Sequence, residues 1–178
     1  MGEEAKILGK ERRSFILNLL KNSTDPITGG ELATKANVSR QVIVGDISLL
    51  KAKNEPILAT SQGYMYMASS NESKQIERTI ACQHTPEQTE QELLLIVDQG
   101  ATVKSVTVEH PVYGEFTASI MVSNRRDVKQ FLEKVKASNA SLLSELTDGI
   151  HLHTISAENE AALNEAIEAL REAGITLE

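Results

Sequence analysis

Three short stretches of helical periodicity, separated by strong turn signals, constrain the start of this chain more than any other feature. Apolar residues recur at helical spacing over 5–21, and the polar cluster 22–26 ends that pattern. A second helix is expected over 30–36 and a third over 40–52, with Ser39 able to cap the third. Two helices joined by so short a turn are typical of a helix-turn-helix.

The segment after the third helix predicts a β-hairpin. Residues 56–60 and 64–67 have the composition of short strands, and 61–63 between them contain a glycine suited to a tight turn. Three helices followed by a hairpin predict a winged helix-turn-helix over residues 1–70. The polar stretch 68–73 is the expected linker to the rest of the chain.

The remainder, residues 76–178, predicts a second domain in which helices pack on a sheet, because strand patterns alternate with helix patterns there. Thr85 and Pro86 form a strong helix start, with a cap followed by proline at the first position. The fold class expected for the whole chain is α+β, with the winged helix-turn-helix first. The expected strands span 79–83, 103–108, 116–123, 150–155 and 175–177, and the expected helices span 86–99, 127–138 and 158–173.

The charge of the chain is distributed unevenly between these two parts. The whole sequence has a formal net charge of −7, but residues 1–70 carry nine Lys and Arg against seven Asp and Glu, which gives +2. Residues 71–178 carry nine against eighteen, which gives −9. Only the first part can approach a polyanion without strong repulsion, so the two parts are expected to have different partners.

Composition argues against several classes of protein. No apolar run approaches the ~20 residues that a membrane helix needs. The first residues lack the basic and apolar regions of a secretory signal, so a cytoplasmic protein with no membrane partner is expected. The single cysteine, Cys82, excludes an internal disulfide and a multi-cysteine metal cluster. We interpret Cys82 as a small buried hydrophobic residue rather than a catalytic thiol.

The third predicted helix has the side chains of a DNA-reading element. Arginine and glutamine can each make two hydrogen bonds to a purine in the major groove, and valine can contact a thymine methyl group. Lysines at the far end of the helix suit phosphates, as does the hairpin tip. A protein-interaction module is the alternative, because +2 is a weak charge for one copy, although a dimer doubles the phosphate contacts. The candidate DNA-binding residues are Ser39, Arg40, Gln41, Val44, Lys51, Lys53 and Gln62.

All four histidines lie in the second part of the chain, and three of them form a candidate metal site with one glutamate. His151 and His153 stand at i and i+2 on a predicted strand, so they point to one face about 6–7 Å apart. Glu92 borders the apolar face of a predicted helix and needs a partner there. With His84 these groups offer three nitrogens and one oxygen, a set suited to Zn²⁺, Ni²⁺, Co²⁺ or Fe²⁺. The alternative is an exposed His-x-His strand face beside a solvated glutamate.

Four segments carry a resemblance to a known family. The helix 39–47, with the sequence Ser-Arg-Gln-Val-Ile-Val-Gly-Asp-Ile, resembles the recognition helix of nicotinate-responsive repressors of NAD biosynthesis, the NiaR (YrxA-like) family. The segments 84–93, 110–114 and 151–153 resemble the histidine-bearing segments of that family's 3H domain. The likeness runs in the expected order over nearly the whole chain.

The resemblance implies a winged helix-turn-helix followed by an α+β sensor domain, the 3H domain, assembled as a homodimer. It implies a transcriptional repressor, not an enzyme, that binds double-stranded operator DNA. The genes repressed would be those for NAD biosynthesis or niacin uptake, when nicotinic acid is plentiful. It also implies a divalent transition metal, nickel or zinc, held by residues that match His84, Glu92, His151 and His153.

Nicotinic acid has two candidate positions in this scheme: an open position of the metal, or a contact with His110 and Tyr113. His110 can equally stabilise its own loop. As a co-repressor, the acid would favour a dimer whose recognition helices match half-sites about 34–36 Å apart. Two alternatives stay open: a metal-responsive regulator, with the ion as effector, and a metal-dependent hydrolase, with an open metal position that activates water. No obvious general base accompanies the site, which disfavours the hydrolase.

Overall fold

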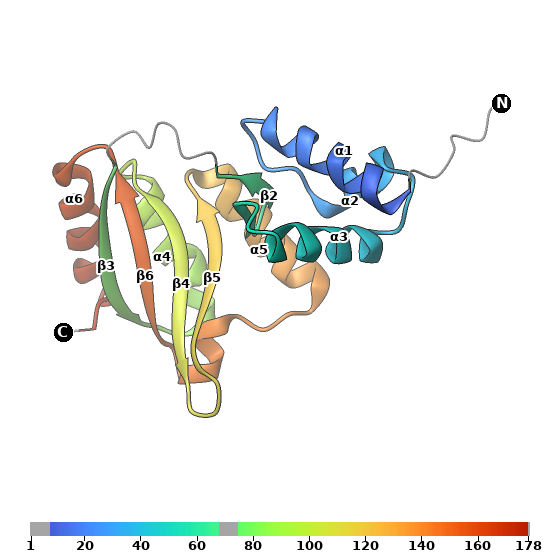
Figure 1. Ribbon diagram of the computed structural model, residues 1–178. Helices are drawn as coiled ribbons and strands as arrows, with labels where there is room; N and C mark the ends of the chain where they lie inside the picture. Colours follow the sequence, from blue (N-terminus) through green and yellow to red (C-terminus); the bar gives the residue numbers. More distant parts are fainter. Residues whose placement is uncertain (1–7, 68–74, 178) are drawn as a thin grey trace. The chain divides into compact units, whose positions relative to one another are not determined.

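The computed structural model describes residues 8–67 and 75–177 and divides the chain into two compact units, Met1–Ser70 and Asn71–Glu178 (Figure 1). The helix start expected at Ala5 and the linker expected over 68–73 lie outside the described residues. Each unit has a cluster of buried hydrophobic side chains of its own. Each unit therefore has the core that an independent domain needs.

The N-terminal unit contains the three helices and the hairpin that the sequence predicts. The hydroxyl of Thr28 accepts from the backbone N–H of Glu31, whose carboxylate accepts from the N–H of Thr28, so a capping box starts the second helix. Ser39 caps the third helix by accepting from the N–H of Val42. The elements are α1 (Gly9–Lys21), α2 (Gly29–Lys35), α3 (Arg40–Ala52), β1 (Ile57–Thr60) and β2 (Gly63–Tyr66).

The hairpin is tied to the start of α2 by backbone pairing. Ile27 and Tyr64 form an antiparallel bridge with N–H···O bonds of 3.0 and 2.8 Å. Gly63 has a φ of 139°, and a Cβ there would come within 2.6 Å of the backbone of Ile27, so only glycine allows this close approach. The core of this unit is formed by Ile16, Leu20, Leu32, Ala33, Ala36, Ile43, Ile47, Leu50 and Ile57.

A buried ion pair joins α1 to α3. The Nε of Arg12 donates to a carboxylate oxygen of Asp46 at 2.5 Å, and Arg13 donates to the other oxygen at 3.3 Å. Asp46 and Arg12 are both buried. Because a buried charge is costly without its partner, this pair holds α3 in one orientation against α1.

Replacing Asp46 by asparagine is expected to lower the free energy of unfolding of this unit by about 3 kcal/mol. The change leaves the guanidinium of Arg12 buried beside a neutral amide. Chemical denaturation followed by circular dichroism measures the effect. Asp25→Asn, at an exposed position of the same unit, is the control and should change stability little. Equal stabilities of the two variants would contradict the assigned role of the ion pair.

The C-terminal unit is a four-stranded antiparallel sheet with helices packed on it. The strand order is β3-β6-β4-β5, so the last strand of the chain lies between β3 and β4. This placement brings β6 into the middle of the sheet (Figure 1). The elements are β3 (Ile76–Gln83), the 3₁₀ helix η1 (Pro86–Gln88), α4 (Thr89–Val97), β4 (Thr102–His110), β5 (Gly114–Val122), α5 (Arg125–Ser138), the 3₁₀ helix η2 (Leu143–Thr147), β6 (Ile150–Ala157) and α6 (Glu160–Glu172).

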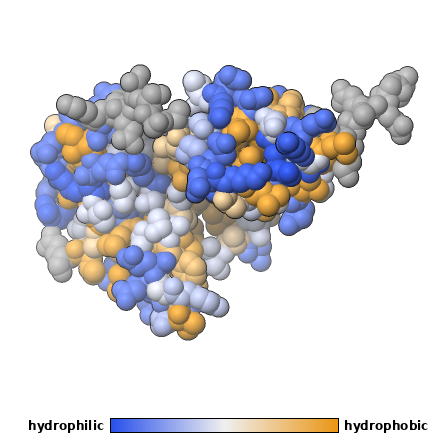
Figure 2. Space-filling model, in the orientation of Figure 1, coloured by the Kyte–Doolittle hydropathy of each residue, from blue (hydrophilic) through white to orange (hydrophobic). Residues whose placement is uncertain are grey.

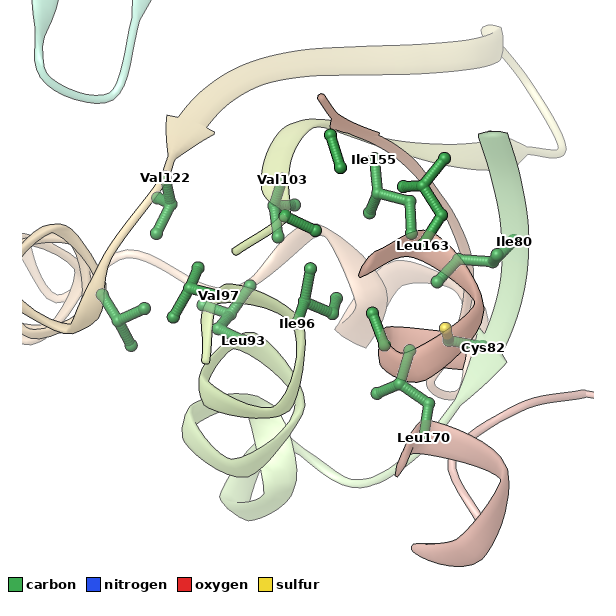
Figure 3. Close-up of a cluster of buried hydrophobic side chains, with 14 of the residues drawn as sticks. Ile80, Cys82, Leu93, Ile96, Val97, Val103, Val122, Ile155, Leu163 and Leu170 are labelled. Carbon is green, nitrogen blue, oxygen red and sulfur yellow. The ribbon is translucent and has the colours of Figure 1, made fainter. Parts of the chain in front are cut away.

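One apolar core fixes the helices against one face of this sheet. Figure 3 shows Leu93 of α4 and Leu163 and Leu170 of α6 in the same cluster as Ile155 of β6 and Ile80 of β3. All five belong to the buried core. At about 25 cal/mol for each Å² of apolar surface removed from water, this core is the main force that positions α4 over the middle of the sheet.

Two expectations about elements are wrong in detail. The segment 175–177 is not a strand, because Thr176 makes only an isolated bridge to Cys82. The helix expected over 86–99 divides into η1 and the shorter α4, which ends at Val97. The helix η2 was not predicted, since its five residues show no helical periodicity.

No helix among the described residues is long and apolar enough to cross a membrane. Figure 2 shows hydrophilic and hydrophobic residues interspersed on the visible face.

Gly149, just before β6, holds two parts of the C-terminal unit together. Its φ of 87° lies in the left-handed region, and a Cβ there would collide with the backbone carbonyl of His84. Its own carbonyl accepts from the Nδ1 of His151 at 2.9 Å. The glycine therefore lets two histidine-bearing segments approach each other closely.

Replacing Gly149 by alanine is expected to destabilise the C-terminal unit more than Gly100→Ala does, for which left-handed strain alone costs about 1–2 kcal/mol. Both glycines have a positive φ, but a Cβ at Gly100 meets nothing within 4 Å. Only Gly149→Ala adds a backbone collision to the strain. Thermal unfolding of the two variants measures the difference, and identical losses would contradict the close-packing argument.

Candidate metal centre and DNA interface

Four polar side chains from three segments converge inside the C-terminal unit. His151 and His153 stand two residues apart on β6, so the strand period directs both side chains to the buried, helix-covered face. His84 follows the end of β3, and Glu92 lies in the first turn of α4. All four are buried, and Glu92 is only 1 % exposed. The structure thus brings together the set of side chains that the sequence singles out as a candidate metal site.

Glu92 is the point at which the three imidazoles meet. The Nε2 of His84 lies 2.7 Å from one carboxylate oxygen, and the Nε2 of His153 lies 3.2 Å from the same oxygen. The Nε2 of His151 lies 3.0 Å from the other oxygen. The rings of neighbouring histidines meet edge to face, with centroids 4.9 and 4.7 Å apart. The same nitrogen of each ring therefore faces the carboxylate.

The second nitrogen of each ring faces a backbone carbonyl. A carbonyl oxygen can only accept, so each Nδ1 has to carry a proton and donate it. Such carbonyl contacts fix the tautomer and the orientation of a histidine that binds metal through its other nitrogen. The pairs are His84 with Thr85 at 2.7 Å, His151 with Gly149 at 2.9 Å, and His153 with Ser105 at 3.0 Å.

The protein groups alone are in conflict in both extreme protonation states of the cluster. If the rings are neutral with Nδ1–H, three Nε2 lone pairs point at a carboxylate, which is repulsive. If all three rings are doubly protonated, two net positive charges are buried, which is costly. A bound divalent cation accepts all four lone-pair donors at once and removes the conflict. The donor set therefore fits a metal ion.

The contacts in this cluster shift the pKa of Glu92 and of His84. Burial alone raises the pKa of Glu92, but the hydrogen bonds of His151, His153 and His84 and the charge of His153 outweigh burial and hold the pKa well below its usual range. For His84, burial lowers the pKa, but the hydrogen bond to Glu92 and the charge of Glu92 together outweigh burial. The pKa of His84 is therefore raised. Glu92 is thus ionised at ordinary pH.

Cys82 lies closer to this cluster than the sequence indicates. It is fully buried in the core, as expected, yet its sulfur lies within 4.8 Å of ligand atoms of Glu92 and His151. The register explains this, because Cys82 and His151 are directly paired between β3 and β6. Burial raises the pKa of the Cys82 thiol, and the charge of Glu92 raises it further.

A cavity of about 160 Å³ opens beside the four side chains. It lies between α4, α5, the segment around η2 and the sheet. One end is polar, formed by the histidines and Glu92, and the remaining wall is largely apolar. The apolar lining includes Leu93, Val106, Ala118, Ile120, Phe131, Val135, Leu142 and Leu143. This wall does not follow from the sequence pattern, because it assembles residues from five separate elements.

His110 and Tyr113, the other candidate ligand-binding residues, lie elsewhere. They belong to the β4–β5 hairpin, whose tip projects beyond the sheet (Figure 1). The Nδ1 of His110 accepts from the backbone N–H of Val112 at 3.2 Å and of Tyr113 at 3.3 Å. Tyr113 is 73 % exposed, and neither residue lines the cavity. His110 thus stabilises its loop, and the structure does not bring the pair to the histidine cluster.

The exposed side of α3 carries most of the candidate DNA-binding residues. Ser39, Arg40, Gln41, Lys51 and Lys53 are exposed, and Val44 and Gln62 are half-buried, with Gln62 in the hairpin turn. The buried side of the helix faces the core through Ile43, Ile47 and Leu50. The helix therefore presents a polar face at its N-terminal end and basic side chains at its C-terminal end, as a major-groove helix requires.

Comparison with known proteins agrees with both units. A family model described as the 3H domain matches residues 77–178, and one described as an HTH domain matches residues 12–65. The chain is 59 % identical over 178 residues to the transcription repressor NadR of Bacillus subtilis, covering 99 % of each chain. It is 36 % identical over 173 residues to the probable transcription repressor NiaR of Thermotoga maritima, covering 97 % of each.

The chain belongs to the family of 3H-domain transcription repressors. The resemblance and the α+β fold class expected from the sequence are thereby confirmed. A helix-turn-helix domain in a repressor family also implies that the N-terminal unit of this 3H repressor binds double-stranded DNA.

Proposed function

We propose that this 3H repressor binds operator DNA as a homodimer and that its 3H domain holds a divalent transition metal and nicotinic acid. Nicotinic acid then acts as co-repressor of genes for NAD biosynthesis or niacin uptake. The observation that carries the proposal is the cluster around Glu92, in which three imidazoles with fixed Nδ1–H groups direct their free nitrogens at one carboxylate. The family membership supports the repressor role.

The metal would be held by His84, Glu92, His151 and His153. Nickel and zinc both accept imidazole and carboxylate ligands, and the four donors do not choose between them. Three neutral imidazoles and one carboxylate around a divalent ion leave one positive charge. A buried site with that charge favours an anionic ligand next to it, which fits the carboxylate of nicotinic acid.

The cavity beside the cluster is the proposed effector site. Its polar end faces the four donors and its apolar wall suits a flat ring, a combination typical of small-molecule pockets. A pyridine carboxylic acid has about nine non-hydrogen atoms, which a cavity of about 160 Å³ can hold. The alternative position at His110 and Tyr113 lacks such a cavity, so the metal end is preferred.

The DNA-binding part of the proposal rests on α3 and the hairpin. Arg40 and Gln41 would contact base edges, and Lys51 and Lys53 would contact phosphates. A net charge of +2 on residues 1–70 gives one copy few phosphate contacts, so two copies on a palindromic operator are needed for tight binding. The ligand would favour the dimer arrangement that matches the half-sites.

Glu92→Gln is expected to reduce metal content at least tenfold, because the amide carries no charge and is a poor ligand for a transition metal. Metal per chain is measured by mass spectrometry after purification and dialysis. Glu90→Gln, at an exposed position of the same helix, is the matched control and should retain the metal. Full metal content in Glu92→Gln would contradict the proposed role of Glu92 in the metal centre.

A titration of operator DNA with and without nicotinic acid tests the whole proposal. Nicotinic acid is expected to raise the affinity of the metal-loaded protein for the operator by about tenfold or more, within the usual range of allosteric coupling. Arg40→Ala should weaken binding about 5- to 100-fold at every nicotinic acid concentration, because it removes a base contact. An affinity that follows metal concentration but ignores nicotinic acid would instead identify a metal-responsive regulator.

A further inference from the structure

One buried hydroxyl in the cavity has no hydrogen-bond partner. Thr89 opens α4 and is 7 % exposed, and its Oγ1 makes no hydrogen bond within the described part of the chain. It is the single buried side-chain oxygen or nitrogen in that part of the chain with this property. Buried hydroxyls are paired in the great majority of proteins, so this one needs an explanation.

The histidine cluster explains why Thr89 lacks its usual partner. A helical threonine commonly donates to the carbonyl four residues earlier, which here belongs to Thr85. That carbonyl already accepts from the Nδ1 of His84 at 2.7 Å and from the backbone N–H of Gln88 at 3.0 Å. A carbonyl oxygen has two lone pairs, so both are used. The contact that orients His84 therefore leaves the hydroxyl of Thr89 available.

The position of Thr89 connects it to the effector cavity. Thr89 lines the cavity together with His84 and Glu92, and it stands three residues before Glu92 on the same side of α4. A carboxylate that enters this apolar space loses water and needs hydrogen-bond donors. The hydroxyl is a donor at the polar end, next to the cluster.

We infer that the hydroxyl of Thr89 donates a hydrogen bond to a carboxylate oxygen of the effector and makes the cavity selective for a small aromatic acid. The inference rests on the proposed function, because it assumes that the cavity binds nicotinic acid. A hydrogen bond to a charged acceptor is stronger than one to a neutral acceptor. Thr89 therefore favours the acid over the corresponding amide.

Calorimetric titration of three metal-loaded full-length proteins tests this residue. The proteins are wild type, Thr89→Val, which keeps the shape without the hydroxyl, and Thr89→Ser, which keeps the hydroxyl. Nicotinic acid and nicotinamide are the two ligands. Thr89→Val should bind nicotinic acid about tenfold more weakly and lose less affinity for nicotinamide. Thr89→Ser should stay within about threefold of wild type for both ligands.

The outcomes separate this inference from the proposed function. Wild type that binds nicotinic acid while Thr89→Val binds it equally well would refute the role of Thr89 and leave the proposed function standing. Equal losses for acid and amide, or loss of metal from Thr89→Val, would show a structural role and also refute the inference. Wild type that binds no nicotinic acid at all would overturn the proposed function, and the inference with it.

Discussion

The contacts between the buried carboxylate of Glu92 and three imidazoles are the interaction on which the polar centre of the C-terminal unit depends. The carboxylate is held by three imidazoles from two segments, and each imidazole is oriented from behind by a backbone carbonyl. Glu92 is ionised, because the histidines outweigh the effect of burial on its pKa. A negative charge at the centre of a core is tolerated only with a strong cationic partner. The convergence of the three imidazoles on Glu92 stabilises its charge at this point.

Several local features become understandable from this constraint. Gly149 brings the start of β6 against the backbone of His84 and offers its carbonyl to His151. The carbonyl of Thr85 orients His84 and leaves Thr89 without its usual acceptor. The same backbone contacts that orient the histidines thus shape the polar end of a cavity.

The two parts of the chain differ in net charge. The unit that carries the helix-turn-helix has a net charge of +2 on residues 1–70, and the other part carries −9. The buried pair of Arg12 and Asp46 orients α3 within the first unit. Electrostatic attraction to DNA phosphates therefore favours the first part of the chain over the second.

Much of the candidate site was predictable from local spacing. The alternation of His151 and His153 places them on one face whatever the rest of the fold, and Glu92 stands at the edge of an apolar helix face. The position of Cys82 was not predictable, because it depends on the register between β3 and β6. The segment 175–177 was wrongly expected to be a strand, because its pairing with β3 is limited to an isolated bridge between Thr176 and Cys82.

The sequence by itself determined most of the helices, the caps at Thr28 and Ser39, the hairpin and the shared face of His151 and His153. These features depend on contacts between residues a few positions apart. Only the tertiary structure decided that the three histidines meet at Glu92, that His110 stands apart, and that a cavity with one unpaired hydroxyl lies beside them. Distances between elements are set by strand register and by the burial of one shared core, to which residues from the whole unit contribute.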